Sequence, residues 1–153
     1  MRTGVRLGID VGKARIGVAR SDPHGMLATP VETVARGPGD VARIVAIARE
    51  LEAVEVVVGL PLALSGNETA STQDAKDFAR DLFTAVGVPV RMVDERLSTV
   101  SAGRALQASG RNTKKQRPVI DQVAAVIILQ HALDFERSGG LTPGTLLDPD
   151  EGQ

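Results

Sequence analysis

Three acidic residues stand out because of the sequence around them. Asp10 lies inside the apolar stretch LGIDVG, where a carboxylate is costly unless it is paired, hydrogen-bonded or bound to a metal. Glu95 belongs to the charged triplet Asp94-Glu95-Arg96, which directly follows the apolar segment VPVRMV. Asp121 lies near the start of an otherwise apolar helical stretch. If the fold brings these acids together, a divalent cation would relieve their repulsion, and such oxygen ligands suit Mg²⁺ or Mn²⁺.

Each acid also has an ordinary structural explanation. Asp10 could hydrogen-bond the turn at residues 12–14, and the charged triplet could be a solvated turn with an acid that caps the next helix. Asp121 could simply favour the positive end of a helix dipole. The spacing of the three acids in the sequence does not decide between a structural role and a shared metal site, because the acids lie on three distant elements. If they do converge, two metal ions roughly 4 Å apart could activate a water and stabilise the leaving oxygen in phosphodiester cleavage.

Basic residues cluster around the second acid. Between Arg91 and Arg117 there are seven basic and two acidic residues, a local charge of +5 in a chain whose net charge is −1. Such clustering is typical of a surface that binds a phosphate backbone, although a solvated loop would have the same composition. The candidate nucleic-acid contacts from this stretch are Arg96, Arg111, Lys114, Lys115 and Arg117. Two further candidates, Lys13 and Arg15, lie just after Asp10.

A Gly-, Ser-, Asn- and Thr-rich loop lies in the segment VVVGLPLALSGNETAS, before an expected helix. Backbone amides and hydroxyls at such a place can hold a phosphate. The segment lacks the Gly-Lys-Ser/Thr of a Walker A motif, and it could equally be a long connection.

Composition limits the function further. The chain has 153 residues, 42% of them hydrophobic, which suits one domain with a sizeable core. It has no cysteine, and its two histidines lie far apart, so a thiolate or histidine-rich zinc site is not expected. With no Trp or Tyr and three Phe, base stacking has little support, and recognition by backbone shape is expected. The N-terminus resembles no signal peptide and the longest apolar run is too short for a membrane, so we expect a soluble, cytoplasmic protein with no membrane contact.

The elements that must position these residues follow from apolar periodicity and from Gly and Pro breaks. Strands are expected at 5–11, 15–20, 30–34, 54–58 and 88–93, and helices at 40–51, 71–86, 97–108 and 118–135. The short link after the first strand makes the first two strands an antiparallel hairpin, whereas strand–helix–strand links imply parallel neighbours. We therefore predict an α/β fold with a mixed five-stranded sheet, three antiparallel strands then parallel ones, flanked by helices. One domain is expected over residues 1–138, and a mobile C-terminal tail over 139–153.

Four segments, taken together and in order, resemble the YqgF/RuvX family of Holliday-junction resolvases and ribosomal RNA-processing nucleases. They are LGIDVGKARIGVA, VVGLPLALSGNETAS, VDERLSTVSA and DQVAAVIILQHAL, and they span residues 7–133. The chain departs from the family at Thr69, where a glycine is common, and at Ala14, where a second basic residue is common.

The resemblance implies a ribonuclease H-like fold in which Asp10, Glu95 and Asp121 meet as catalytic ligands of Mg²⁺ or Mn²⁺. It implies a metal-dependent nuclease acting on ribosomal RNA precursor or on Holliday junctions, with structured RNA or branched DNA as its partner. A homodimer would suit junction cutting, which needs two symmetric cuts. Two alternatives stay open: a sugar-kinase or actin-like ATPase, which shares the Asp10, Gly12 and Gly17 hairpin pattern but needs two domains, and a non-catalytic nucleic-acid-binding module.

Overall fold

The computed structural model describes residues 3–97, 117–139 and 142–147, and for Leu97 and residues 117–121 it describes only the backbone. The strands are β1 (Arg6–Val11), β2 (Arg15–Ser21), β3 (Ala28–Ala35), β4 (Glu55–Leu60), β5 (Val90–Asp94) and β6 (Thr145–Leu146). The helices are α1 (Asp40–Glu50), α2 (Ala70–Val86), the single 3₁₀ turn η1 (Glu95–Leu97) and α4 (Arg117–Gly139).

The strands form one mixed sheet in the order β3-β2-β1-β4-β5-β6. The pairs β1–β2 and β2–β3 are antiparallel, whereas β1–β4 and β4–β5 are parallel pairs. This confirms the predicted mixed α/β sheet. The number of strands in the sheet differs from the prediction, because the described residues form six strands instead of five. The sixth, β6, pairs antiparallel with β5 and lies in the segment predicted to be a tail. Two residues are too few to show the alternation that marks a strand.

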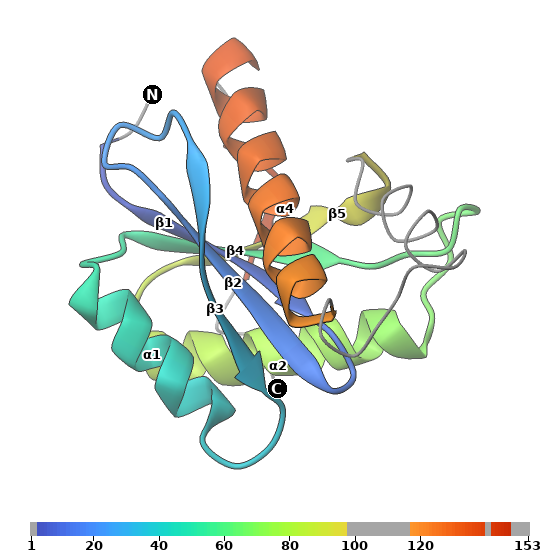
Figure 1. Cartoon of the computed structure of the whole chain (residues 1–153). Coiled ribbons are helices and arrows are strands. Elements are labelled where there is room, and N and C mark those ends of the chain that lie inside the picture. The colour runs from blue at the N-terminus through green and yellow to red at the C-terminus, as the bar shows by residue number, and fades with distance from the viewer. Residues whose placement is uncertain (1–2, 98–116, 140–141, 148–153) are drawn as a thin grey trace.

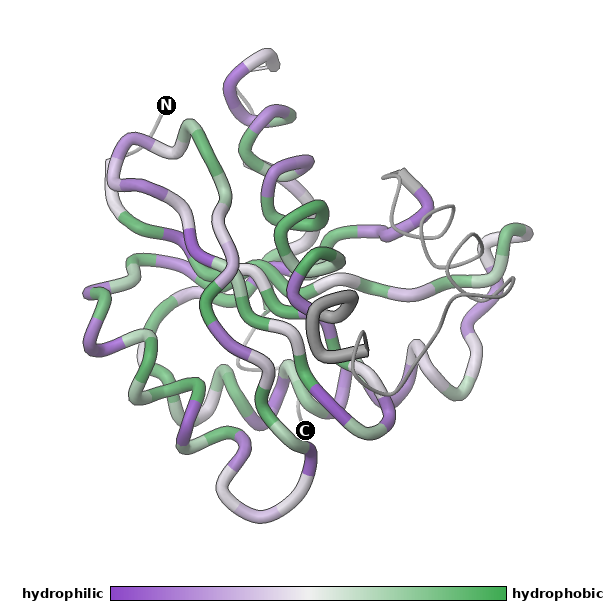
Figure 2. Tube along the Cα trace, viewed as in Figure 1, coloured by the Kyte–Doolittle hydropathy of each residue, from purple (hydrophilic) through white to green (hydrophobic). Residues whose placement is uncertain are grey.

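Three layers result, with α1 and α2 on one face of the sheet and α4 on the other (Figure 1). Alternate residues of β1 separate the two faces, since Leu7 and Ile9 belong to the core under α1 and α2. On the other face, Val57 and Val93 pack with Ile128 of α4. Hydrophobic residues accordingly dominate the central strands and recur along the helices between hydrophilic ones (Figure 2). Among the described residues, no helix is both long and apolar enough to cross a membrane.

Helix α4 approaches the sheet closely above Gly8 of β1. A Cβ atom at Gly8 would lie 2.6 Å from Leu129 Cβ and 2.9 Å from the Ala125 carbonyl oxygen, so only glycine permits this packing. At the start of β1, Arg6 Nη2 donates to Glu136 Oε2 at 3.2 Å, and both side chains are buried. Because residue 136 lies at the start of β1 and residue 125 at its middle, α4 runs antiparallel to β1.

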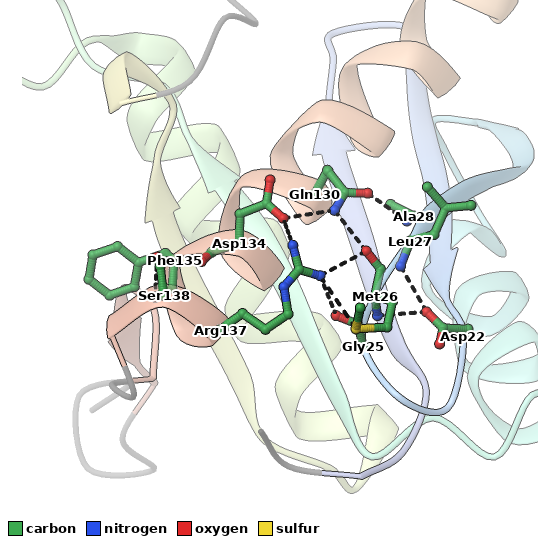
Figure 3. A network of polar contacts seen from close by, with 10 residues as sticks. All are labelled: Asp22, Gly25, Met26, Leu27, Ala28, Gln130, Asp134, Phe135, Arg137 and Ser138. Atoms are coloured by element: carbon green, nitrogen blue, oxygen red, sulfur yellow. Dashed lines mark hydrogen bonds and ion pairs between the residues drawn. The ribbon is translucent and has the colours of Figure 1, made fainter.

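The turn between β2 and β3 fastens the outer side of α4 (Figure 3). Gln130 Oε1 accepts from the Ala28 amide at 2.8 Å, and Gln130 Nε2 donates to the Met26 carbonyl at 3.0 Å. Arg137 Nη1 donates to the same carbonyl at 3.0 Å. The turn itself is held by Asp22 Oδ1, which accepts from the amides of Met26 and Leu27. These contacts fix the C-terminal half of α4 across the sheet.

The loop between β4 and α2 ends in a capping box. The Thr69 hydroxyl accepts from the Thr72 amide at 3.3 Å, and the Thr69 amide donates to Thr72 Oγ1 at 2.9 Å. Thr72 Oγ1 also donates to the Pro61 carbonyl, which ties the start of the loop to the helix. Thr69, the departure from the family pattern, is therefore the N-cap of α2. The helix predicted at 97–108 lies outside the described residues except for Leu97.

Candidate active site

Asp10 lies near the carboxyl end of β1 and is 1% exposed. Strand alternation places it on the same face as Gly8, under α4, and opposite the face that carries Leu7 and Ile9. Its antiparallel neighbour in β2 is Gly17. A carboxylate at such a buried position needs compensation by hydrogen bonds or by a cation.

Glu95 begins the turn η1 directly after β5, and it is 5% exposed. Its carboxylate lies over Gly59 of β4, where a Cβ atom would be 2.7 Å from Glu95 Oε1. The same Cβ atom would lie 2.7 Å from Ile128 Cδ1, so the space above Gly59 is shared by the acid and by helix α4. Gly59 therefore provides the cradle in which the Glu95 carboxylate rests.

The register of the sheet relates Asp10 to this cradle. Ile9 of β1 pairs with Val58 of the parallel strand β4, and Asp10 and Gly59 are the next residues along each strand. Neighbouring strands are ~4.8 Å apart. The Asp10 side chain and the Glu95 carboxylate thus lie on one face, over adjacent strands, at the carboxyl end of the parallel part of the sheet. This is where ligands usually bind in open α/β sheets.

Asp121 lies in α4, and its side chain is outside the described part of the structure. Its backbone is one helical turn before Ala125, whose carbonyl contacts Gly8. Because α4 runs antiparallel to β1, that turn lies toward the end of β1 that carries Asp10. Residue 121 also follows the first turn of α4, beyond which the helix dipole has little effect. The dipole thus explains this acid less well than the sequence suggested.

The donors of this site are carboxylate oxygens, which suit a hard cation such as Mg²⁺ or Mn²⁺. Among the side chains that the structure describes, no three His, Asp or Glu residues form a group that could hold a metal. Asp10 and Glu95 supply two acids, and a third ligand from this chain would have to come from Asp121. The cradle at Gly59 and the all-oxygen donor set fit such a cation.

Arg96 holds the loop beside the site. Its Nη2 donates to Asp94 Oδ2 at 2.7 Å, and its Nη1 donates to the Leu64 carbonyl at 3.3 Å. The hydrogen bonds from the Arg96 side chain hold the pKa of Asp94 below its usual range, against the opposing effect of burial. Arg96 was predicted to contact phosphate. In the structure its side chain joins the end of β5 to the loop after β4, with 31% of its surface exposed.

The other predicted basic contacts divide into two groups. Lys13 is exposed and Arg15 is half-buried, and both lie at the turn between β1 and β2, just after Asp10. Arg111, Lys114 and Lys115 lie outside the described residues, and Arg117 begins α4 with its side chain outside them as well.

Arg36 is a residue that sequence reasoning did not select. Its Nη1 donates to the Gly12 carbonyl at 2.7 Å and to Asp74 Oδ2 at 2.9 Å, while Nη2 donates to Asp74 Oδ1 at 2.9 Å. The guanidinium also lies 5.4 Å from the centre of the Phe78 ring. Arg36 thus fastens the turn that follows Asp10 to helix α2. No local motif marks such a contact, because its partners lie far apart in the sequence.

Known proteins are similar to this chain in sequence and in fold. Residues 4–135 match the family model described as "RuvX: Holliday junction resolvase". The chain is 66% identical over 158 residues to the "Putative pre-16S rRNA nuclease" of Clavibacter michiganensis subsp. michiganensis, and the alignment covers 98% of each chain. A protein of the same name from Leifsonia xyli subsp. xyli is 63% identical over 152 residues, covering 97% of each.

A solved structure of T. thermophilus RuvC in complex with a Holliday junction substrate is similar to this chain with a TM-score of 0.57. The alignment covers 92% of this chain and 99% of that one, at 21% identity. At this identity the likeness concerns the fold, and it confirms the ribonuclease H-like fold that the resemblance implied. From the match over residues 4–135 and the high identity to curated relatives, this chain belongs to the RuvX family.

Proposed function

We propose that this protein is a metal-dependent nuclease that hydrolyses phosphodiester bonds in precursor ribosomal RNA. Close relatives carry the name of a pre-16S rRNA nuclease, which favours a nuclease over the sugar-kinase-like ATPase. Such a substrate implies a cytoplasmic location.

The observation that carries the proposal is the pair of buried acids on one face of the sheet. Asp10 is 1% exposed and Glu95 is 5% exposed, and both lie beneath an apolar helix. Two carboxylates buried over adjacent strands repel one another, and a bound divalent cation would relieve that repulsion. Gly59 keeps space for the Glu95 carboxylate at a position where any other residue would fill it.

In this proposal Asp10, Glu95 and Asp121 hold Mg²⁺ or Mn²⁺. When bound, the metal would supply an activated water and stabilise the leaving oxygen of the cut strand. The protein contributes rigid placement of the acids, since two of them lie at strand ends of the same sheet. Ile128 of α4 borders the same space above Gly59 that the Glu95 carboxylate occupies.

The basic residues hold the substrate. Lys13 and Arg15 are placed by the turn after Asp10, where their charge would meet phosphates entering the site. Arg111, Lys114, Lys115 and Arg117 would add positive charge next to the start of α4. Neutralising phosphates in this way makes affinity fall steeply with salt. Arg96 would affect substrate binding mainly by holding the loop after β4 in place.

The test is cleavage of a labelled ribosomal RNA precursor fragment with Mg²⁺, Mn²⁺ or chelator. Asp10→Asn, Glu95→Gln and Asp121→Asn should each lower the rate by at least ~100-fold, because each removes a metal ligand. Asp81→Asn, an exposed acid on α2, is the matched control and should cut like the wild type. Wild-type rates in all three site variants would refute the proposal.

A second substrate is favoured by the description of the matching family as Holliday junction resolvase. A synthetic four-way junction therefore belongs in the same assay. Two symmetric cuts in a junction need two active sites, so junction cutting would come with a homodimer. Cutting of the junction and not of the RNA would reassign the substrate while leaving the nuclease in place.

A further inference from the structure

A cavity of about 300 Å³ lies beside the candidate active site. It is lined by residues of β5 and α4, by the segment after β4, and by residues 143–145. Its apolar lining includes Leu60, Met92 and Val93, and its polar lining includes Asp94. Asp94 immediately precedes Glu95 in the chain, although Glu95 itself is not among the residues that line the cavity.

The chemistry of the cavity does not suit a phosphate. Most of its lining is apolar, and no arginine or lysine is among the described residues that line it. Asp94 would repel an anion, although Arg96 offsets part of its charge from outside the cavity. A neutral group with an apolar surface and a polar edge is a better match.

The aromatic ring of Phe135 offers a flat apolar surface to a neutral ligand in this cavity. Phe135 lines the cavity and is 45% exposed, whereas Phe78 is buried and Phe83 is half-buried. Its ring points away from the contacts between α4 and the β2–β3 turn (Figure 3). Proteins that bind unpaired nucleotides stack bases on exposed aromatic rings of this kind. Because the sequence contains so few aromatic residues, it had favoured recognition of nucleic acid by backbone shape more than by base edges.

We propose that this cavity binds one nucleobase of the substrate strand, next to the phosphodiester that the acids cut. The inference rests on the proposed nuclease function for its substrate. The base would stack on Phe135, with Asp94 and His131 offering hydrogen bonds to its edge. The volume of the cavity is at the lower end of the range found for ligand pockets, which favours binding of one base over binding of a base pair.

The direct test needs no cleavage. Methyl NMR of the full chain without metal would follow Leu60, Met92 and Val93 while nucleoside 5′-monophosphates are added. Saturable shifts are expected with the nucleotides and not with ribose 5-phosphate, which carries the phosphate without the base. Equal shifts with ribose 5-phosphate, or no shifts with any nucleotide, would overturn the proposal.

Variants of Phe135 extend the test to RNA. Phe135→Ala should weaken binding of a short unpaired RNA by about 5- to 150-fold, the range for loss of one stacked base. Phe135→Leu keeps the apolar volume without the aromatic ring and should also bind more weakly. Val123→Ala changes a residue of similar exposure on the same helix, outside the cavity, and should bind like the wild type. Wild-type affinity in both Phe135 variants would overturn the proposal.

The two proposals fail separately. Nucleotide-dependent shifts in a protein that cuts neither substrate would keep the base site and refute the nuclease. Metal-dependent cutting that is indifferent to Phe135, in a protein whose methyl signals ignore nucleotides, would keep the nuclease and refute the base site.

Discussion

At the scale of single residues, the site depends on an absent side chain as much as on the acids themselves. Gly59 follows three consecutive valines in β4, and it leaves open the space that the Glu95 carboxylate occupies. Ile128 closes the same space from the side of α4. One methyl group at this position would compete with a buried acid and a buried aliphatic side chain at once.

Gly59→Ala should therefore impair cleavage more than it impairs folding. The added Cβ atom would lie 2.7 Å from Glu95 Oε1, so the carboxylate must move from its position. Overpacking of this kind costs about 1–3 kcal/mol of unfolding free energy. Cleavage rates and urea denaturation would measure the two effects. Gly139→Ala is the control, because a Cβ atom there meets nothing within 4 Å. Unchanged cleavage in Gly59→Ala would show that Glu95 does not need this cradle.

At the scale of elements, the turn between β1 and β2 is held in place by a neighbouring helix. Arg36 bridges the Gly12 carbonyl and Asp74 of α2, and hydrogen bonds from its guanidinium are the main cause that lowers the pKa of Asp74. A carboxyl whose pKa is lowered on folding stabilises the fold above its unfolded pKa, near 3.8. That contribution is lost as the pH falls through the lowered folded value.

Arg36→Met should raise the pKa of Asp74 toward its ordinary value. Titration of the Asp74 carboxyl carbon by NMR would show the change. The stability difference between wild type and variant should be present at pH 6 and should shrink below about pH 4. Arg43→Met removes the exposed pair with Glu32 and should leave the titration of Asp74 unchanged. An Asp74 pKa that stays low without Arg36 would contradict this account of the turn.

Helix α4 is anchored by charge near its C-terminal end, above the start of β1. Arg6 and Glu136 form a buried ion pair, with 2% and 7% of their side chains exposed. Glu136→Gln should lower the unfolding free energy by about 3–5 kcal/mol, since it leaves Arg6 buried opposite a neutral partner. Urea denaturation would measure the loss, and Glu50→Gln on the exposed side of α1 is the control. A loss no larger than that of the control would show that the pair does not hold the helix.

At the scale of the whole molecule, three layers bring distant parts of the chain to one edge of the sheet. The sequence allowed the mixed sheet and the helices α1 and α2 to be predicted, because apolar residues recur there with the periods of strand and helix. It did not reveal β6, which has only two residues, or the contact between Gly59 and Glu95, which depends on the register between β4 and β5. The buried pair of Arg6 and Glu136 joins residues 130 positions apart, and no local pattern encodes such a distance.

The candidate acids could be named from the sequence because a carboxylate in an apolar strand is unusual and because the family resemblance related three such residues. The structure relates Asp10 to Glu95 through the sheet and places the backbone of residue 121 in a helix that crosses it. That all three bind one metal is the central claim, and it is a proposal about side chains on three separate elements.

Binding of Mn²⁺ to the protein without nucleic acid tests this claim most directly. Calorimetry would compare the wild type with Asp10→Asn, Glu95→Gln, Asp121→Asn and the control Asp81→Asn, each first shown to be folded. We expect the wild type and the control to bind Mn²⁺ alike, and each site variant to bind it much more weakly, because each loses a charged ligand. Wild-type Mn²⁺ affinity in any one of the three site variants would contradict a shared metal site built from these acids.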